Sequence, residues 1–187
     1  IFNYKLGDAQ RADYYKKINL RTVEEYGDQE ARDEAVARSA VEALRRDINE
    51  QKLDHILMAR TETQARADAL AKIYERLAPE FAPVKVYSGR PASQNRAALA
   101  ALRDRKNTNS RIVICVDMLG EGFDFSQFKL AALHDTHKSL AITLQFIGRF
   151  TRKGPVDVGD ATVITNIADP DAEKKLAALY AEGADWD

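Results

Sequence analysis

Short apolar runs alternate with longer amphipathic segments along most of the chain. Runs of this kind, apolar and short enough to be buried strands, occupy residues 53–59, 84–87, 111–116, 130–133 and 161–167. Strands that alternate with helices predict an α/β fold whose sheet is mainly parallel, with right-handed crossovers and helices on both faces.

Helices are expected between these strands. Residues 28–50 carry Glu, Arg, Ala and Leu with almost no helix breakers, and Asp28 can cap the start of a long amphipathic helix. The segment Thr61-Glu62-Thr63-Gln64 has the form of a capping box, which predicts a second helix after the first strand. A turn at residues 88–91 precedes a third helix over about residues 93–104.

Candidate chemistry belongs at one edge of such a sheet, because ligands of parallel α/β folds bind beyond the carboxyl ends of the strands. The loops that follow four of the expected strands therefore matter most. They are residues 59–61, 87–90, 117–124 and 134–138.

Composition narrows the class of protein. The 187 residues suit one domain, and the formal net charge of −1 excludes a polycation that attracts nucleic acid by its total charge. Cys115 is the only cysteine and lies in an apolar run, so we expect a buried thiol and a reducing, cytoplasmic setting. No run approaches the roughly 18 apolar residues that a membrane span needs, so no membrane partner is expected.

The chain divides by pattern into two parts. Residues 1–27 have the character of a connector, and residues 28–187 form the expected domain. Since the sequence starts at Ile1 without an initiator methionine, we expect it to be part of a longer protein.

The segment at residues 145–152 is the sharpest chemical feature. On a helix Gln145, Gly148, Arg149 and Arg152 share one face, because they stand at i, i+3, i+4 and i+7. Two guanidinium groups on one face suit phosphate recognition and the stabilisation of charge on a transferring phosphoryl group. An ordinary surface helix with two solvated arginines is the alternative.

A second feature follows the strand at residues 111–116. In Gly120-Glu121-Gly122-Phe123-Asp124 two glycines flank an acid, so backbone amides can turn toward an anion and Asp124 can accept hydrogen bonds from sugar hydroxyls. A tight turn that ends in aspartate would explain the same residues without a ligand.

Together these segments resemble a known family. Gln145-x-x-Gly148-Arg149-x-x-Arg152 resembles motif VI of superfamily 2 helicases of the DEAD/DEAH type, and residues 120–124 resemble motif V. Residues 56–61 are similar to motif IV, and Tyr87-Ser88-Gly89 looks like the turn after the next strand in that family. The resemblance covers about residues 52–168, with the motifs in the family's order.

The resemblance implies a fold and a role. The fold would be a three-layer α/β/α RecA-like domain of the P-loop NTPase type, the C-terminal lobe of a two-lobed ATP-dependent helicase or translocase. ATP would lie between the lobes, with Mg²⁺ held mainly by the N-terminal lobe. Nucleic acid would cross both lobes, bound through its sugar-phosphate chain with little base specificity.

The resemblance also implies roles for individual residues. Catalytic roles fall to Arg149 and Arg152, as arginine fingers, and to Gln145, which would couple nucleotide state to lobe closure. The nucleotide side would be lined by Gly122, Asp124 and Gly148. Nucleic-acid contacts are expected from Arg60, Thr61, Ser88, Gly89, Gly120 and Glu121.

Departures from the full motor pattern limit what the chain can do by itself. It has no G-x-x-x-x-G-K-[ST] loop and no Asp-Glu-x-Asp/His box, which are the parts that hold phosphates and magnesium. We therefore expect no ATP hydrolysis by the chain alone.

Glu121 bears on which nucleic acid the domain would bind. Glu121 stands where DEAD-box RNA helicases carry arginine, and Glu-Gly-Phe-Asp looks like the restriction-enzyme and DNA-translocase branches. The start of residues 1–27 is also similar to the connector of type I and type III restriction helicase subunits. Duplex DNA, an N-terminal lobe and restriction-modification subunits are thus the expected partners.

Other interpretations remain. A non-catalytic RecA-like scaffold that binds a partner would keep the motif residues for structural reasons. A small-molecule enzyme on a doubly wound sheet has no support, because neither a glycine-rich first turn nor a catalytic acid pair is evident. We expect no metal site at His55, His134 or His137, because a single cysteine and scattered histidines make a poor ligand set.

Overall fold

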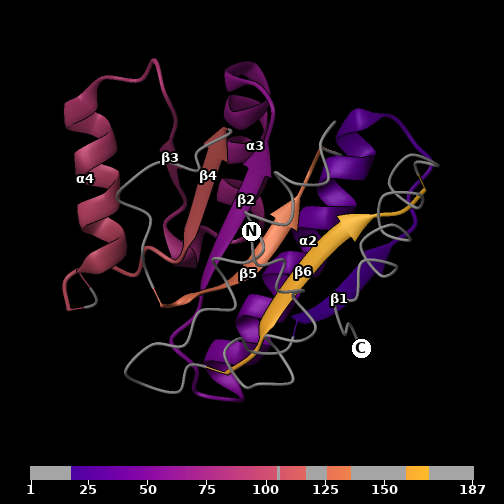
Figure 1. Cartoon of the computed structure of the whole chain (residues 1–187), viewed down its shortest axis with the longest axis horizontal. Coiled ribbons are helices and arrows are strands. Elements are labelled where there is room, and N and C mark those ends of the chain that lie inside the picture. The colour runs from indigo at the N-terminus through magenta and orange to yellow at the C-terminus, as the bar shows by residue number, and fades with distance from the viewer. Residues whose placement is uncertain (1–17, 105, 117–125, 136–158, 169–187) are drawn as a thin grey trace, which may run out of the picture.

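A parallel sheet organises the chain. The computed structural model describes residues 18–104, 106–116, 126–135 and 159–168. Its strands are β1 (Ile18–Val23), β2 (Ile56–Thr61), β3 (Val84–Val86), β4 (Ile112–Val116), β5 (Phe128–Leu133) and β6 (Ala161–Asn166). They are hydrogen-bonded in the order β1-β6-β5-β2-β4-β3, and each neighbouring pair is parallel (Figure 1). All described strands thus end at the same edge, which we call the carboxyl edge.

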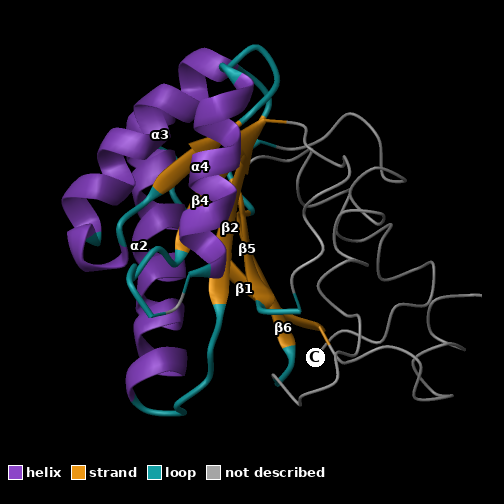
Figure 2. Ribbon diagram, turned by 90° about the vertical axis from the view of Figure 1, so that its left-hand side faces the viewer, coloured by secondary structure: helices purple, strands orange, loops and turns teal. Residues whose placement is uncertain are grey.

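Helices connect the strands and cover the sheet. The described helices are α2 (Gln29–Asn49), α3 (Gln64–Leu77), α4 (Ala92–Arg103) and the short 3₁₀ helix η1 (Pro79–Phe81). Side chains of α2 and α3 form one apolar cluster with residues such as Leu57, Ile112 and Leu130. In the edge-on view of Figure 2 these two helices pack along one face of the sheet, whereas Ala98 and Leu102 of α4 belong to the cluster of the other face.

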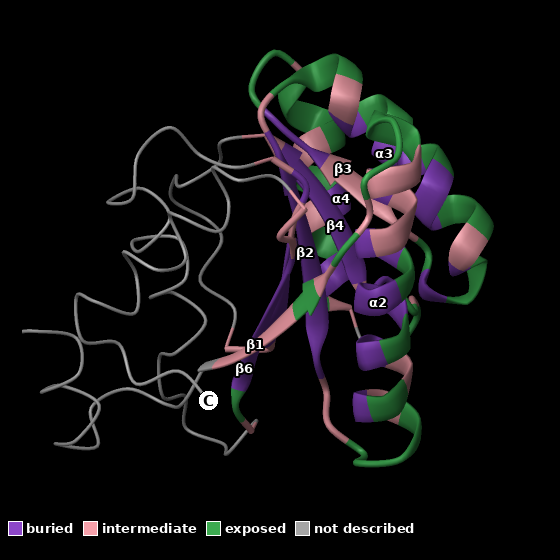
Figure 3. Cartoon of the chain, turned by 90° about the vertical axis from the view of Figure 1, so that its right-hand side faces the viewer, coloured by how far each residue is buried: buried purple, intermediate pink, exposed green. Residues whose placement is uncertain are grey.

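The apolar runs that form the central strands are buried on both faces, as predicted. Every residue of β2 is buried (Figure 3). The apolar side chains of β4 and β5 alternate between the two clusters. Continuous burial explains why these strands appear in the sequence as unbroken apolar runs instead of alternating patterns. Cys115, in β4, is fully buried, as expected. Within the described residues, no helix is long and apolar enough to cross a membrane.

Helix starts agree with the sequence at α2 and differ at α3. The Asp28 carboxylate accepts a hydrogen bond from the backbone N–H of Ala31 at 2.9 Å, which confirms the predicted cap. At α3 the capping residue is Thr63 and not Thr61, so the predicted capping box is wrong. Thr61 instead continues β2, paired with Val116 of β4, and its hydroxyl bonds Asp135.

The strand β1 lies in the range that the sequence assigns to a connector. It pairs with β6 over six residues, and Arg21 reaches the carboxylate of Glu42 on α2 at 3.0 Å. Asn19 and Arg21 interrupt its apolar character because β1 is an edge strand, which explains why the hydrophobic pattern does not reveal it. The division between residues 27 and 28 stays a prediction, but the sheet extends across it.

The N-cap of α2 provides a stability test. Replacing Asp28 with Ala removes the acceptor for a first-turn N–H, so we expect a loss of about 1 kcal/mol in the free energy of unfolding, measured by urea denaturation. Asp28→Asn keeps a side-chain oxygen acceptor and should retain most of that stability. Equal losses in the two variants would show that the carboxylate charge, and not the cap, is what matters.

Candidate functional site

The carboxyl edge gathers the described part of the candidate site. Because each helix runs back against the strands, the first turns of α2, α3 and α4 also lie at this edge, where their unpaired N–H groups favour negative charge. The polar residues found here follow β2, β3 and β5. The predicted residues Gly120, Glu121, Gly122, Asp124, Gln145, Gly148, Arg149 and Arg152 lie outside the described residues.

Arg66, in the first turn of α3, is the centre of a partly buried polar network. Its Nη2 donates to both carboxylate oxygens of Asp33 on α2, at 2.9 and 3.2 Å, and to the His134 carbonyl oxygen at 3.2 Å. Its Nε lies 3.1 Å from the Asp135 carboxylate and 3.1 Å from the Thr61 hydroxyl. One guanidinium therefore joins α2, α3 and the ends of β2 and β5.

His134 completes the network on its buried side. Its Nδ1 lies 3.1 Å from the Asp33 carboxylate and its Nε2 lies 2.9 Å from the Tyr74 hydroxyl. A carboxylate can only accept, so Nδ1 carries the proton, and in the neutral ring Nε2 then accepts from Tyr74. Burial, and secondarily the charge of Asp33, raise the pKa of Tyr74 well above its usual value, which keeps this hydroxyl protonated as a donor.

Asp135 fixes the end of β2 and the start of the loop that follows it. Its Oδ2 accepts hydrogen bonds from the Thr61 hydroxyl and, at 2.8 Å, from the backbone N–H of Glu62. The backbone N–H of His134 donates to the Arg60 carbonyl oxygen at 3.1 Å. The loops after β2 and β5 are thus held together by side-chain and backbone bonds.

The predicted nucleic-acid residues of β2 are buried. Arg60 is 3% exposed and Thr61 is fully buried, and because strand side chains alternate they lie on opposite faces of the sheet. In this conformation neither side chain offers surface to a phosphate. The expected nucleic-acid contact of Arg60 and Thr61 stays a prediction, and the burial of both side chains does not support it.

The predicted residues Ser88 and Gly89 lie in an exposed turn at the same edge. The turn closes through the Arg90 N–H and the Tyr87 carbonyl oxygen, and the Gln64 amide of α3 donates to the Ser88 carbonyl at 2.7 Å. Gly89 has φ of +89°, and a Cβ there would lie 2.6 Å from Gln64 Nε2. Glycine is required by this backbone conformation, and the exposed turn is docked on the start of α3.

Sequence reasoning did not single out Asp33, Arg66 or Tyr74. Asp33 precedes Val36, Ala37 and Ala40 by three, four and seven residues, so it occupies the buried stripe of α2. An acid in an apolar stripe must be paired, and that was the available signal. Its partners lie 33 and 101 residues away in the chain, where no local pattern indicates them.

The described residues contain no cluster of three or more His, Cys, Asp or Glu side chains suited to a metal ion. His55 lies 2.9 Å from the buried Asp47 carboxylate, and His134 bonds Asp33 and Tyr74. Both histidines thus join polar pairs inside the domain.

Comparison with known proteins gives one family and several related structures. The family model described as "Helicase conserved C-terminal domain" matches residues 37–154. This range includes both motif segments, at residues 120–124 and 145–152. No match is found among curated proteins.

The related structures share the fold at low identity. Domain 2 of the DEAD-box helicase Mss116p, bound to an RNA duplex, is 15% identical with a TM-score of 0.64 over 91% of this chain and 62% of that one. A fragment of a type I restriction enzyme HsdR subunit from Vibrio vulnificus YJ016 is 17% identical with a TM-score of 0.71 over 100% of this chain and 38% of that one. The C-terminal domain of the DEAD-box protein Dbp5 is 14% identical with a TM-score of 0.60 over 91% of this chain and 86% of that one.

These likenesses confirm the RecA-like α/β fold that the resemblance implies. The chain spans less than two thirds of the Mss116p and HsdR chains.

The network can be tested by removing its cation. Arg66→Met leaves the buried carboxylate of Asp33 without its charge partner, so we expect a loss of about 2–4 kcal/mol in the free energy of unfolding. The measurement is chemical denaturation at neutral pH.

Arg76→Met is the matched control, since Arg76 also joins α3 to α2, through Glu34. Hydrogen bonds, the larger from Arg76 and the smaller from Arg38, lower the pKa of Glu34 to about 2. The Arg76–Glu34 pair is nevertheless exposed and screened by water. We expect little change in this variant. Similar losses in both variants would contradict the central role of Arg66.

Proposed function

Because the chain belongs to the helicase conserved C-terminal domain family, we propose that it is the C-terminal motor lobe of an ATP-dependent nucleic-acid helicase or translocase. The observation that carries this proposal is the family match over residues 37–154, which includes the motif V and motif VI segments. The parallel sheet, with helix N-termini gathered at its carboxyl edge, is a framework suited to such a lobe.

The proposed chemistry rests on two arginines. Arg149 and Arg152 approach the phosphates of ATP from across the cleft to the N-terminal lobe and stabilise charge that develops on the transferring phosphoryl group. Gln145 couples this contact to lobe closure, and Gly148 allows close approach. Gly122 and Asp124 line the nucleotide, with Asp124 near the ribose.

ATP and Mg²⁺ are held mainly by the N-terminal lobe in this proposal, because the chain has no phosphate-binding loop and no magnesium-binding acid box. By itself the chain is inactive. The lobe therefore supplies half of an ATPase site.

The proposed nucleic-acid track follows the carboxyl edge. Exposure of the Ser88-Gly89 turn, and its anchoring to α3 through Gln64, supports a backbone contact to phosphate at this point. Gly120 and Glu121 continue the track after β4, while Arg60 and Thr61 shape it from the end of β2. Such contacts position the strand without reading its bases.

Duplex DNA is the proposed track. The support is Glu121 in place of an arginine, together with the structural likeness to the type I restriction enzyme subunit, which covers the whole chain. The likeness to Mss116p, which is bound to an RNA duplex, makes RNA the alternative that experiment has to exclude. Restriction-modification subunits are the proposed partners, and the cytoplasm is the proposed location.

ATP turnover by the full-length protein tests the motor. We expect duplex DNA to stimulate hydrolysis, and Arg149→Ala or Arg152→Ala to reduce the stimulated rate by about 10³-fold while folding is retained. Turnover should be measured with duplex DNA, single-stranded DNA and RNA in parallel.

Arg38→Ala is the control, because this arginine is exposed on α2 and pairs only with Glu34 among the described residues. It should leave turnover unchanged. Unchanged turnover in both Arg149→Ala and Arg152→Ala would contradict the proposed role of these arginines in ATP hydrolysis. A full-length sequence without a phosphate-binding loop would favour the alternative, a non-catalytic RecA-like domain that binds a partner.

A further inference from the structure

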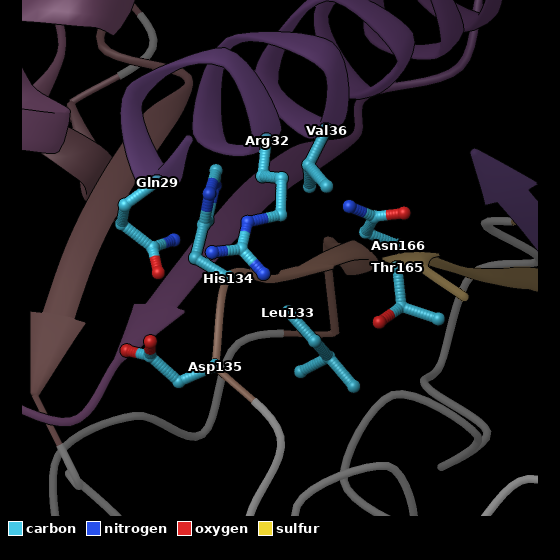
Figure 4. Close-up of a pocket in the computed structure, with 8 residues that line it drawn as sticks. All are labelled: Gln29, Arg32, Val36, Leu133, His134, Asp135, Thr165 and Asn166. Atoms are coloured by element: carbon cyan, nitrogen blue, oxygen red, sulfur yellow. The ribbon is translucent and has the colours of Figure 1, made fainter. Parts of the chain in front are cut away.

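A small cavity opens at the carboxyl ends of β5 and β6, beside the first turns of α2. Its volume is about 90 Å³. Figure 4 shows the Arg32 guanidinium directed from α2 toward the ends of both strands, with Thr165 on one side and His134 on the other. This cavity adjoins the network around Arg66, since His134 and Asp135 line it as well.

The Arg32 side chain has no partner in the part of the chain that the structure describes. Its Nε is buried and bonds no acceptor, although a guanidinium carries five N–H donors. Among the donors of Arg32, the backbone N–H is bonded, to the carbonyl oxygen of the N-cap residue Asp28. Buried donors without acceptors are rare in folded proteins, and a ligand oxygen in the cavity would satisfy this one.

The neighbouring polar groups of the described residues do not accept a hydrogen bond from Arg32, and three of them are bonded elsewhere. Asp135 is paired with Arg66 at 2.9 Å, and Gln29 donates to Asp33 at 3.3 Å. The Asn166 amide exchanges hydrogen bonds with the backbone of Glu25, at 3.2 and 2.8 Å. Arg66 pairs with both carboxylates on the acidic side of the cavity, Asp33 and Asp135, whereas the Arg32 guanidinium is unpaired among the described residues.

The chemistry of the site favours a phosphate. A planar guanidinium donates two parallel hydrogen bonds to phosphate oxygens, and the first turn of α2 adds positive potential at the same place. The cavity has room for one tetrahedral anion, and the Thr165 hydroxyl lies in its wall.

The position of the site indicates where the phosphate comes from. In the order β6-β5-β2-β4-β3, Arg32 stands at the β6/β5 end of the carboxyl edge, and the Ser88-Gly89 turn stands at the β3 end. With about 4.8 Å between neighbouring strands, the β6 side of the cavity lies roughly 10 Å beyond the end of β2, the length of about three phosphates along one strand of B-DNA.

We propose that Arg32 binds a backbone phosphate of the nucleic acid, which extends the track across β5 to β6. This inference rests on the proposed function. It adds a contact on α2 that lies outside the family's motif segments.

Salt-dependent binding of a labelled DNA duplex to the full-length protein tests the proposal, with a labelled RNA duplex in parallel. Each phosphate contact contributes about 0.9 to the slope of log K against log salt, measured from about 50 to about 200 mM. We expect Arg32→Gln to lower affinity about tenfold at about 0.1 M salt and to reduce the slope by about 0.9. Arg32→Lys should keep the slope and lose part of the affinity, because lysine retains the charge but cannot donate two parallel hydrogen bonds as a guanidinium does.

Arg38→Gln is the matched control, since it removes the same charge from an exposed position of the same helix. It should change neither affinity nor slope. A slope for Arg32→Gln equal to that of Arg38→Gln overturns the proposal. The proposal also fails if Arg32→Gln keeps the slope but releases a partner subunit in size-exclusion chromatography, which would identify a protein carboxylate as the ligand.

Failure of the Arg32 proposal can be distinguished from failure of the proposed motor function. ATP turnover of Arg149→Ala reports on the motor alone, whereas the salt slope of Arg32→Gln reports on the phosphate contact alone. Wild-type protein that binds neither duplex overturns both proposals.

Discussion

The contact on which the carboxyl edge depends is the one between the Arg66 guanidinium and the carboxylates of Asp33 and Asp135. Charges in a protein interior are stable only when they are paired, so the positions of α2, α3 and the end of β5 are coupled. His134 and Tyr74 extend the coupling into the core, and Thr61 extends it to the end of β2. Movement of either helix along the sheet would separate these groups.

This coupling bears directly on the proposed motor. A net charge of −1 gives the chain no general attraction for phosphate, so binding has to come from local groups. Arg66 is paired with two aspartates, whereas Arg32 is unpaired among the described residues and is the local group that we propose binds phosphate. Helix N-termini at the same edge add to the positive potential. One edge of the sheet thus combines firmly bonded loops with a guanidinium whose charge is available to a ligand.

The fold was largely predictable because its central strands are buried on both faces. Such strands are unbroken apolar runs, and the predicted runs match β2 to β6 with small shifts at their ends. The strand β1 escaped prediction since an edge strand keeps polar residues such as Asn19 and Arg21. At α3, Thr61 and Thr63 both suit a cap locally, and the ladder of β4 assigns Thr61 to the strand.

The sequence by itself determined the α/β class, the buried strands, the family resemblance and the exposed turn at Ser88-Gly89, because each depends on residues that are neighbours in the chain. Tertiary structure alone decided the partners of Asp33, the burial of Arg60 and Thr61, and the cavity beside Arg32. Asp33 of α2 meets Arg66 and His134, which lie 33 and 101 positions away in the chain, and the cavity joins α2 to β5 and β6. A buried charge is paired by whichever group lies beside it in the folded protein. The local periodicity of the sequence does not indicate which distant residue that is.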